Sequence, residues 1–340
     1  MIGQMMQTIP CVGVIGAGSW GTALAIHLAR QGVPVRLWGR DPVQMQAMRE
    51  QRQNLRYLPG IDFPPSLQPV VALEQLLHDA PRLLVAVPSS SFRATLRLIA
   101  AQCAHLEGLV WATKGLEMDS GQWLHEIIAQ ELPRPLPQAV VSGPSFAQEL
   151  ARGQPTALTV ASWEGAFAQE VTTWLNGGTL RTYTSEDVLG VELGGALKNV
   201  LAIAAGISDG LGFGANARAA LITRGLAELM RLGEAVGART ETLMGLSGLG
   251  DLVLTCTDNQ SRNRRLGLAL GAGHSLDEAI AQIGQAVEGA RTAAVIVDKA
   301  AQAGVELPIS TQVHHVLYAG LPPQRAVEIL LRREIKPEFR

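Results

Sequence analysis

The feature that most constrains the fold is an alternation of short β-branched runs with helical stretches over the first 185 of the 340 residues. This alternation is typical of a parallel sheet covered by helices on both faces. Several runs are apolar at every position, as strands buried on both faces must be. The expected strands are CVGVIG from Cys11, PVRLW from Pro34, LLVAV from Leu83, LVWAT from Leu109, AVVSG from Ala139, ALTVA from Ala157 and LRTYT from Leu180.

After Ser185 the β-branched runs stop, and alanine- and leucine-rich segments with helical periodicity take over. We expect a first helix over residues 186–207, a second over 215–236, and further helices after Asp251, Leu276, Ala290 and Gln324. The length also favours two domains. The sequence therefore predicts a doubly wound α/β domain over residues 8–185, followed by an all-helical domain over residues 186–335.

A glycine-rich turn joins the first expected strand to the first expected helix. In CVGVIGAGSWGTALA, Gly16, Gly18 and Gly21 have the GxGxxG spacing. The first glycine makes the tight turn, the second lets the backbone approach a pyrophosphate, and the third lets helix and strand pack closely. The helix N-terminus then offers free N–H groups to the phosphates. A glycine turn without a ligand is the alternative, but the position between strand and helix favours a Rossmann-type dinucleotide site.

The choice of dinucleotide is expected to depend on the end of the second strand, which reads Trp38, Gly39, Arg40, Asp41. An acidic residue at this place binds the ribose hydroxyls of NAD, whereas an arginine accommodates the extra phosphate of NADP. Arg40 stands at the expected place, so NADP(H) is preferred. NAD(H) stays open, because a shift of one residue would bring Asp41 there. The other role for Asp41 is to cap the helix that begins at Pro42.

Polar residues follow three of the expected strands, where doubly wound sheets bind their ligands. Lys114 is the most informative of them, since an ammonium at this edge can reach both a cofactor and an anionic substrate. A solvated surface lysine is the alternative. The three segments are residues 88–91, residues 114–115 and residues 142–145.

Lys198 stands in VELGGALKNVLAIAAGI, where every helical neighbour within a turn is apolar or small except Asn199. Burial would force this lysine to be paired or to lose its proton, and a lysine with a depressed pKa is suited to proton transfer near neutral pH. The alternative is a lysine whose ammonium reaches the surface along an apolar stem.

The run GLGDLVLTCTDNQSRNRR combines carboxylate, hydroxyl, amide and guanidinium groups. Arginine presents a planar fork that matches phosphate oxygens, and serine and asparagine can complete such a site. Three arginines on an ordinary solvated face is the alternative, and a nucleic-acid site would need more basic residues and aromatic platforms. The polar residues of the run include Asp251, Thr255, Ser261, Arg262, Asn263, Arg264 and Arg265.

Composition narrows the class of protein further. The net charge of −2 provides no basic field for nucleic acid. Cys11, Cys103 and Cys256 are widely separated and lack metal-ligand spacing, so we expect reduced thiols and no metal. The first residues lack a secretion signal, and the longest apolar stretch, residues 193–207, falls short of the ~20 residues that cross a bilayer. We therefore expect a soluble cytoplasmic protein without membrane insertion.

Together, GAGSWGTALA, WATKGLE, SGPSFAQEL, GVELGGALKNVLAIAAGISDGLGFGANARAALITRG, GLSGLGDLVLTCTDNQSRNRRLG and IGQAVEG resemble the bacterial NAD(P)-dependent glycerol-3-phosphate dehydrogenases. The resemblance runs in order from about Val12 to Leu317, and the KNV and TDNQSRNRR segments are its most specific parts. It implies a Rossmann domain coupled to an all-helical domain, a homodimer, and interconversion of dihydroxyacetone phosphate and sn-glycerol 3-phosphate for phospholipid synthesis.

The resemblance also implies roles for individual residues. Lys198 is the catalytic proton donor and acceptor, and Lys114 contacts both cofactor and substrate. The other implied substrate contacts are Gly143, Ser145, Asp251, Ser261, Arg262 and Asn263. The implied cofactor contacts are Gly16, Gly18, Ser19, Trp20, Gly21, Arg40, Lys114, Ala147, Arg262 and Glu288.

Two other functions stay open at this point. One is a different two-domain NADP-dependent reductase of a hydroxy acid or ketoacid, whose carboxylate substrate would not need Arg262 and Asn263. The other is a non-catalytic NADP sensor, which would have no use for Lys198 together with Lys114. If the chain is such a dehydrogenase and Lys114 lies about 5 Å from Lys198, repulsion would lower the pKa of one of the two lysines, and Asp251 would offset much of this if it contacts Lys198.

Overall fold

The computed structural model describes residues 10–102 and 105–334, and these form two compact units. The sheet unit comprises Met1–Lys114 and Trp123–Val191, and the helical unit comprises Gly115–Gln122 and Glu192–Arg340, so far as their residues are described. The chain therefore changes unit within a helix, beyond the expected boundary at 185/186. A short segment after Lys114 also groups with the helical unit.

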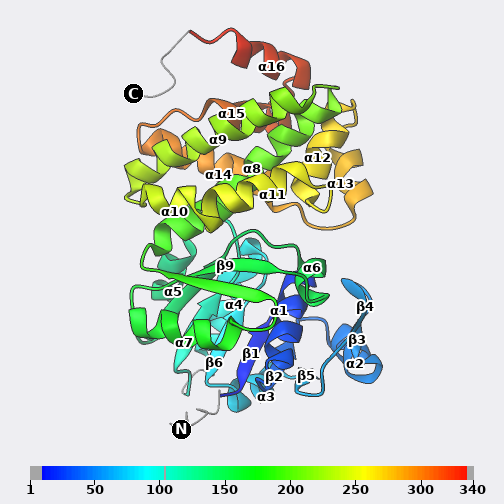
Figure 1. Ribbon diagram of the computed structural model, residues 1–340, viewed down its shortest axis with the longest axis vertical. Helices are drawn as coiled ribbons and strands as arrows, with labels where there is room; N and C mark the ends of the chain where they lie inside the picture. Colours follow the sequence, from blue (N-terminus) through cyan, green and yellow to red (C-terminus); the bar gives the residue numbers. More distant parts are fainter. Residues whose placement is uncertain (1–9, 103–104, 335–340) are drawn as a thin grey trace. The chain divides into compact units, whose positions relative to one another are not determined.

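The sheet unit contains an eight-stranded sheet in the order β10-β9-β8-β7-β6-β1-β2-β5 (Figure 1). All seven expected strands are present, which confirms the doubly wound α/β fold. The sequence did not predict β5 or the small hairpin of β3 (Gln53–Asn54) and β4 (Leu58–Asp62). The strands of the main sheet are β1 (Val12–Ile15), β2 (Val35–Trp38), β5 (Leu67–Val70), β6 (Arg82–Val85), β7 (Gly108–Trp111), β8 (Gln138–Ser142), β9 (Thr156–Ala161) and β10 (Leu180–Ser185).

One expected property of the sheet is wrong, because the sheet is not parallel throughout. β8 pairs with β9 in antiparallel register, with Val140 opposite Ala161 and Ser142 opposite Thr159. A five-residue helix, α6 (Ala147–Ala151), lies between these strands. Alternation of strands and helices in a sequence carries no information on strand direction, and antiparallel edge strands are common on such sheets.

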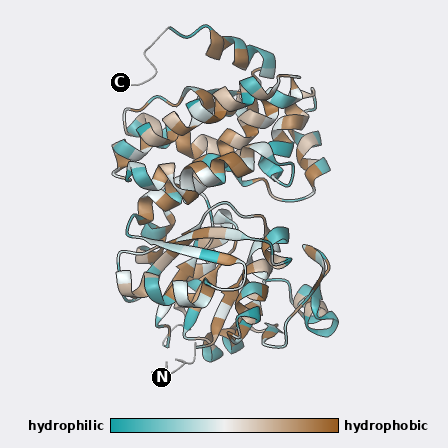
Figure 2. Cartoon of the chain, viewed as in Figure 1, coloured by the Kyte–Doolittle hydropathy of each residue, from teal (hydrophilic) through white to brown (hydrophobic). Residues whose placement is uncertain are grey.

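The central strands β1, β6 and β7 are buried on both faces, and their successive side chains enter different cores. Within β7, Val110 packs in the core beside α1 and α7, whereas Leu109 and Trp111 pack in the core beside α3, α4 and α5. Apolar residues colour several strands brown in Figure 2, whereas the foremost strands are partly white and teal and the peripheral helix α2 is largely teal. The remaining helices are α1 (Ser19–Arg30), α2 (Pro42–Gln51), α3 (Leu73–Asp79), α4 (Ser89–Ala100), α5 (Leu124–Glu131) and α7 (Gly165–Leu175).

The sheet reverses its strand order beside β1. The chain leaves β1 toward β2 and β5 on one side, then returns to β6 on the other. The turns after β1 and β6 consequently meet, and a Cβ on Gly16 would lie 2.6 Å from the carbonyl oxygen of Ala86. Open α/β sheets bind their ligands at this place.

The helical unit holds the helices that the sequence predicted (Figure 1), and α9 has the expected bounds. It also contains α10, η1, α12 and α15, which the sequence did not predict. The elements are α8 (Val188–Gly210), α9 (Ala215–Val236), α10 (Thr240–Met244), the π-helical turn η1 (Leu246–Gly250), α11 (Asp251–Thr257), α12 (Arg262–Gly271), α13 (Leu276–Ile283), α14 (Glu288–Gln302), α15 (Pro308–Tyr318) and α16 (Pro323–Leu331).

Helices α8 and α12 are in direct backbone contact. A Cβ on Gly206 would lie 2.1 Å from the carbonyl oxygen of Arg264, and a Cβ on Gly267 would lie 2.1 Å from that of Ile203. Gly210 and Gly271 repeat this contact one turn further along. Only glycine permits this approach, which packs α12 directly against the C-terminal part of α8.

Among the described residues, α8 is the one helix long and apolar enough to cross a membrane. Of its most apolar 18-residue window, 94% is buried inside the structure. Such burial is the pattern of a core helix, and a single helix of this kind is weak support for a membrane span. The expected absence of membrane insertion stays a prediction.

Candidate functional site

The three glycines of the GxGxxG turn have different surroundings. Gly16 has φ +121°, and a Cβ on Gly21 would lie 2.0 Å from the carbonyl oxygen of Gly16, so the fold itself requires both glycines. Gly18 has φ −79°, and a Cβ there would meet no described atom within 4 Å. The fold does not require a glycine at this position. The open space beside Gly18 fits a pyrophosphate that approaches the backbone.

Helix α1 begins directly after Gly18, which is its N-cap and has no side chain to bond the first N–H groups. Ser19 and Trp20 form the start of the helix, and both are half-buried. The first turn of a helix carries partial positive charge and N–H donors that suit an anion. The turn and the helix start therefore fit a dinucleotide together.

The end of β2 places Arg40 at the surface and gives Asp41 a structural role. Asp41 Oδ1 accepts hydrogen bonds from the backbone N–H groups of Val43 at 3.0 Å and Gln44 at 3.2 Å. The capping role considered for Asp41 is thus present. The side chain of Gln44 also donates to the carbonyl oxygen of Ala17 at 3.2 Å, which ties α2 to the glycine turn.

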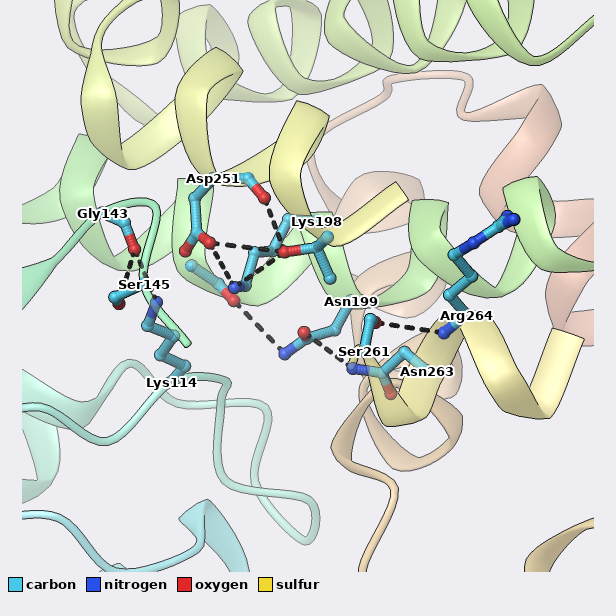
Figure 3. Close-up of polar contacts among 11 residues, drawn as sticks. Lys114, Gly143, Ser145, Lys198, Asn199, Asp251, Ser261, Asn263 and Arg264 are labelled. Atoms are coloured by element: carbon cyan, nitrogen blue, oxygen red, sulfur yellow. Dashed lines mark hydrogen bonds and ion pairs between the residues drawn. The ribbon is translucent and has the colours of Figure 1, made fainter. Parts of the chain in front are cut away.

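Three predicted site residues come together after β7 and β8 (Figure 3). Lys114 Nζ donates to the carbonyl oxygen of Gly143 at 3.3 Å, and the Ser145 hydroxyl donates to the same oxygen at 3.0 Å. Gly143 has φ +145°, which favours glycine here. These strands are parallel neighbours, so their carboxyl ends lie at one edge of the sheet. Ala147, a predicted cofactor contact, is half-buried at the start of α6.

Lys198 is buried in α8 and paired, with 9% of its side chain exposed. Its Nζ donates to Asp251 Oδ1 at 2.5 Å, as Figure 3 shows. Nζ also donates to Thr255 Oγ1 at 3.1 Å. The Asp251 side chain is fully buried, and the Thr255 hydroxyl donates to the Asp251 carbonyl at 2.6 Å. Of the two outcomes expected for a buried lysine, the structure has the ion pair. Breaking such a pair by removing one partner costs about 3–5 kcal/mol.

Close packing brings the partners of Lys198 to α8. A Cβ on Gly194 would lie 2.3 Å from the carbonyl oxygen of Ser247, so the turn before α11 contacts the backbone of α8. Cys256 is also buried beside these groups, and burial raises the pKa of its thiol to about 12. The thiol therefore stays protonated near neutral pH.

The start of α12 is joined to α8 and α14 by amide groups. Asn263 Nδ2 donates to Asn199 Oδ1 at 2.8 Å, and Asn263 Oδ1 accepts from the Gly289 N–H at 2.9 Å. The Ser261 hydroxyl caps α12 by accepting from the Arg264 N–H at 3.2 Å. Ser261 and Asn263 thus hold the helix start in place, whatever else they bind.

The three arginines of the SRNRR segment have different surroundings. Arg264 is buried, with Nη1 2.5 Å from Asp209 Oδ2. Arg262 is half-buried, and its Nη1 donates to Gln285 Oε1 at 3.3 Å, whereas Arg265 is exposed. Arg264 is therefore committed to the fold, and Arg262 is the better placed of the other two for a ligand.

Glu288, a predicted cofactor contact, is half-buried at the start of α14. Its neighbour Gly289 bonds Asn263, and Gln285 bonds Arg262. The structure thereby brings the IGQAVEG and SRNRR segments together within the helical unit. Over residues 10–102 and 105–334, His, Cys, Asp and Glu side chains form no group of three or more that could hold a metal ion.

Two family models together match most of the chain. The model of the NAD-dependent glycerol-3-phosphate dehydrogenase N-terminus matches residues 11–168, and that of the C-terminus matches residues 187–328. The chain belongs to the NAD-dependent glycerol-3-phosphate dehydrogenase family. The resemblance stated from the motifs is therefore confirmed, and the alternative hydroxy-acid or ketoacid reductase family is not supported.

Individual relatives agree with this assignment. The glycerol-3-phosphate dehydrogenase [NAD(P)+] of Thioalkalivibrio sulfidiphilus is 66% identical over 330 residues, which cover 97% of this chain and 99% of the relative. That of Nitrosococcus oceani is 60% identical over 96% of this chain and 95% of its own. The crystal structure of glycerol-3-phosphate dehydrogenase from Coxiella burnetii is 47% identical and superposes with a TM-score of 0.92, covering 95% of this chain and 99% of that one.

Two residues that bond predicted site residues of this dehydrogenase family member were not themselves predicted. Thr255 accepts from Lys198, and Asn199 accepts from Asn263. Thr255 follows Asp251 by four residues, so the two lie on one face of α11, and this spacing could have identified it. Asn199 carried no signal beyond its place next to Lys198. Its bond to Asn263 spans 64 residues of sequence and depends on how α8 and α12 pack.

Proposed function

We propose that this chain is an sn-glycerol-3-phosphate dehydrogenase that reduces dihydroxyacetone phosphate to sn-glycerol 3-phosphate, which supplies glycerophospholipid synthesis. NADPH is the preferred hydride donor, and NADH is also used. The observation that carries the proposal is a buried lysine paired with Asp251 and Thr255 in a member of this family.

The sheet unit holds the dinucleotide. Gly16, Gly18 and Gly21 form the turn under the pyrophosphate, and the start of α1 at Ser19 and Trp20 supplies N–H donors. When bound, the reduced nicotinamide supplies a hydride to the carbonyl carbon of the substrate. The further cofactor contacts that we propose are Arg40, Lys114, Ala147, Arg262 and Glu288.

Lys198 supplies the proton. As the carbonyl carbon accepts the hydride, the carbonyl oxygen gains negative charge, which the Nζ ammonium stabilises and then neutralises by donating a proton. Lys198 becomes a neutral amine and recovers a proton from solvent. In the opposite direction the amine accepts the hydroxyl proton. Asp251 and Thr255 hold Nζ in one place throughout.

Arg262 binds the substrate phosphate. Its guanidinium is half-buried at the N-terminus of α12, where helix N–H groups also favour an anion. A charge-assisted contact of this kind contributes about 1.5–3 kcal/mol. Ser261 and Asn263 beside it, together with Asp251, Lys114, Gly143 and Ser145, are the remaining proposed substrate contacts.

We also propose that the enzyme works without a metal, as a homodimer in the cytoplasm. The chemistry needs one hydride and one proton, and the dinucleotide and Lys198 supply both. Size-exclusion chromatography with light scattering tests the dimer, and full activity in a chelator tests the independence from metal.

The first experiment measures the loss of NADPH absorbance with dihydroxyacetone phosphate, beside dihydroxyacetone and beside NADH in place of NADPH. Rapid oxidation with the phosphorylated ketone alone is expected, and the two dinucleotides then rank in the proposed order. Tight NADPH binding without any oxidation would contradict the proposal and point to a sensor.

A further inference from the structure

The hairpin formed by β3 (Gln53–Asn54) and β4 (Leu58–Asp62) is anchored to the glycine turn. Asn54 is buried, and its Nδ2 donates to the carbonyl oxygen of Ala17 at 3.0 Å and to Thr22 Oγ1 at 2.8 Å. Ala17 lies between the first two glycines of the turn. The hairpin therefore holds a fixed position beside the proposed dinucleotide.

The tip of this hairpin presents an arginine on an aromatic ring. The Tyr57 N–H donates to Asn54 Oδ1 at 3.2 Å, which fixes the tip to the anchored residue. The Arg56 guanidinium carbon lies 5.1 Å from the centre of the Tyr57 ring. A guanidinium stacked on a ring keeps its edge available for a planar or phosphate acceptor.

Arg56 also faces the end of β2. Its Nη1 lies 3.8 Å from Asp41 Oδ2, with 63% and 44% of the two side chains exposed. Such an exposed and long ion pair contributes little to stability. The other oxygen of Asp41 caps α2, and Arg40 directly precedes Asp41. A second guanidinium thus stands beside the place where the sequence predicts the adenosine ribose.

We propose that Arg56 is a specificity-determining residue that binds the 2′-phosphate of NADP(H). Asp41 is its counter-ion when no phosphate is present, and the negative charge of Asp41 limits the preference for NADP(H), so NAD(H) stays usable. This inference rests on the proposed dinucleotide-dependent function and adds a residue 16 positions after Arg40 in the sequence.

The test compares two adenosine fragments, 2′,5′-ADP and 5′-AMP, by calorimetry with the full-length protein. They differ by the 2′-phosphate alone. Arg56→Gln is expected to weaken 2′,5′-ADP binding about tenfold and 5′-AMP binding less than about twofold. Asp41→Asn keeps a residue that caps helices well and removes the charge, so it is expected to tighten 2′,5′-ADP binding about threefold.

Arg49→Gln is the matched control, because Arg49 is an exposed arginine in the last turn of α2 and its loss changes the net charge equally. Its expected effect on either fragment is less than about twofold. An unchanged affinity ratio in Arg56→Gln, or an equal loss in Arg49→Gln, would overturn the inference. The proposed function is tested separately, by turnover of dihydroxyacetone phosphate. Normal turnover would leave that function standing even if either of these results overturned the role of Arg56.

Discussion

In the glycine turn of the sheet unit the backbone forms the proposed binding surface, whereas around Lys198 in the helical unit side chains form the proposed site. The turn requires glycine at Gly16 and Gly21, where a Cβ would meet neighbouring backbone, whereas Gly18 leaves open space. The Lys198 cluster needs a carboxylate and a hydroxyl at 2.5 and 3.1 Å from one nitrogen. The first region is built from one continuous segment, and the second joins residues more than fifty positions apart.

This difference teaches how each region responds to change. A backbone site fails when any side chain fills its space, so its loss appears as weaker binding. A side-chain site fails when one chemical group is removed, so its loss appears in turnover. Glycines also serve the second region, but indirectly, since they let α12 and η1 approach α8.

The largest expected effect comes from Lys198→Met. Turnover of dihydroxyacetone phosphate should fall about 10⁴-fold, because the group that donates the proton is gone. NADPH affinity, measured by fluorescence titration, should stay within about twofold of the parent. Turnover within tenfold of the parent would show that Lys198 does not donate the proton.

Arg262→Ala should chiefly impair use of the phosphorylated substrate. We expect the transition-state stabilisation calculated from kcat/KM to fall by about 1.5–3 kcal/mol for dihydroxyacetone phosphate and to change little for dihydroxyacetone. Arg265→Ala, three residues along the same helix and exposed, is the control with the same charge change. Equal losses in the two variants would mean a general charge effect.

Gly267→Ala tests the packing beneath the side-chain site. The new Cβ would lie 2.1 Å from the Ile203 carbonyl oxygen, so α12 must move away from α8. Overpacking costs about 1–3 kcal/mol and the higher helix propensity of alanine recovers about 1 kcal/mol, so we expect the free energy of unfolding to fall by up to about 2 kcal/mol. Urea denaturation measures it. Gly165→Ala, at a helix position where a Cβ meets no described atom within 4 Å, should lose nothing.

Gly18→Ala tests the backbone site without disturbing the fold. Since φ is −79° and the space is open, the free energy of unfolding should stay within about 0.5 kcal/mol of the parent. Binding of either dinucleotide should weaken about tenfold, because the methyl group occupies the approach of the pyrophosphate. Unchanged affinity would show that no ligand comes close to this position, whereas Gly21→Ala should destabilise the fold itself.

The smallest effect concerns a histidine away from both regions. Burial lowers the pKa of His27, whose Nε2 lies 2.6 Å from the Leu175 carbonyl oxygen. The unfolded chain therefore binds a proton near pH 6.5 that the folded chain resists, and the stability that His27 contributes above this pH is lost as the pH falls below it. We expect a loss of about 0.5–1 kcal/mol between pH 7.5 and 5.5. His27→Gln should flatten this part of the stability profile, and an unchanged slope would contradict the assignment.

Local signals predicted much of this molecule. Strand and helix positions followed from periodicity, and α9 was predicted to the residue, because each pattern depends on one continuous segment. The antiparallel pairing of β8 and β9 and the existence of α12 could not be predicted in this way. Strand direction is not encoded in the alternation of strands and helices. Helix α12 begins with polar residues, and its position depends on glycines that contact α8.

The sequence alone determined the glycine turn, the charged lysine in an apolar helix and the family, since each is encoded in neighbouring residues. Only the tertiary structure decided which charges pair. Lys198 pairs with Asp251, and Arg56 faces Asp41. Arg264, and not Arg262, forms an ion pair with Asp209. The physical reason is that a charge interacts through space over a few ångströms. Which charges come that close depends on how helices and strands pack, and not on their separation along the chain.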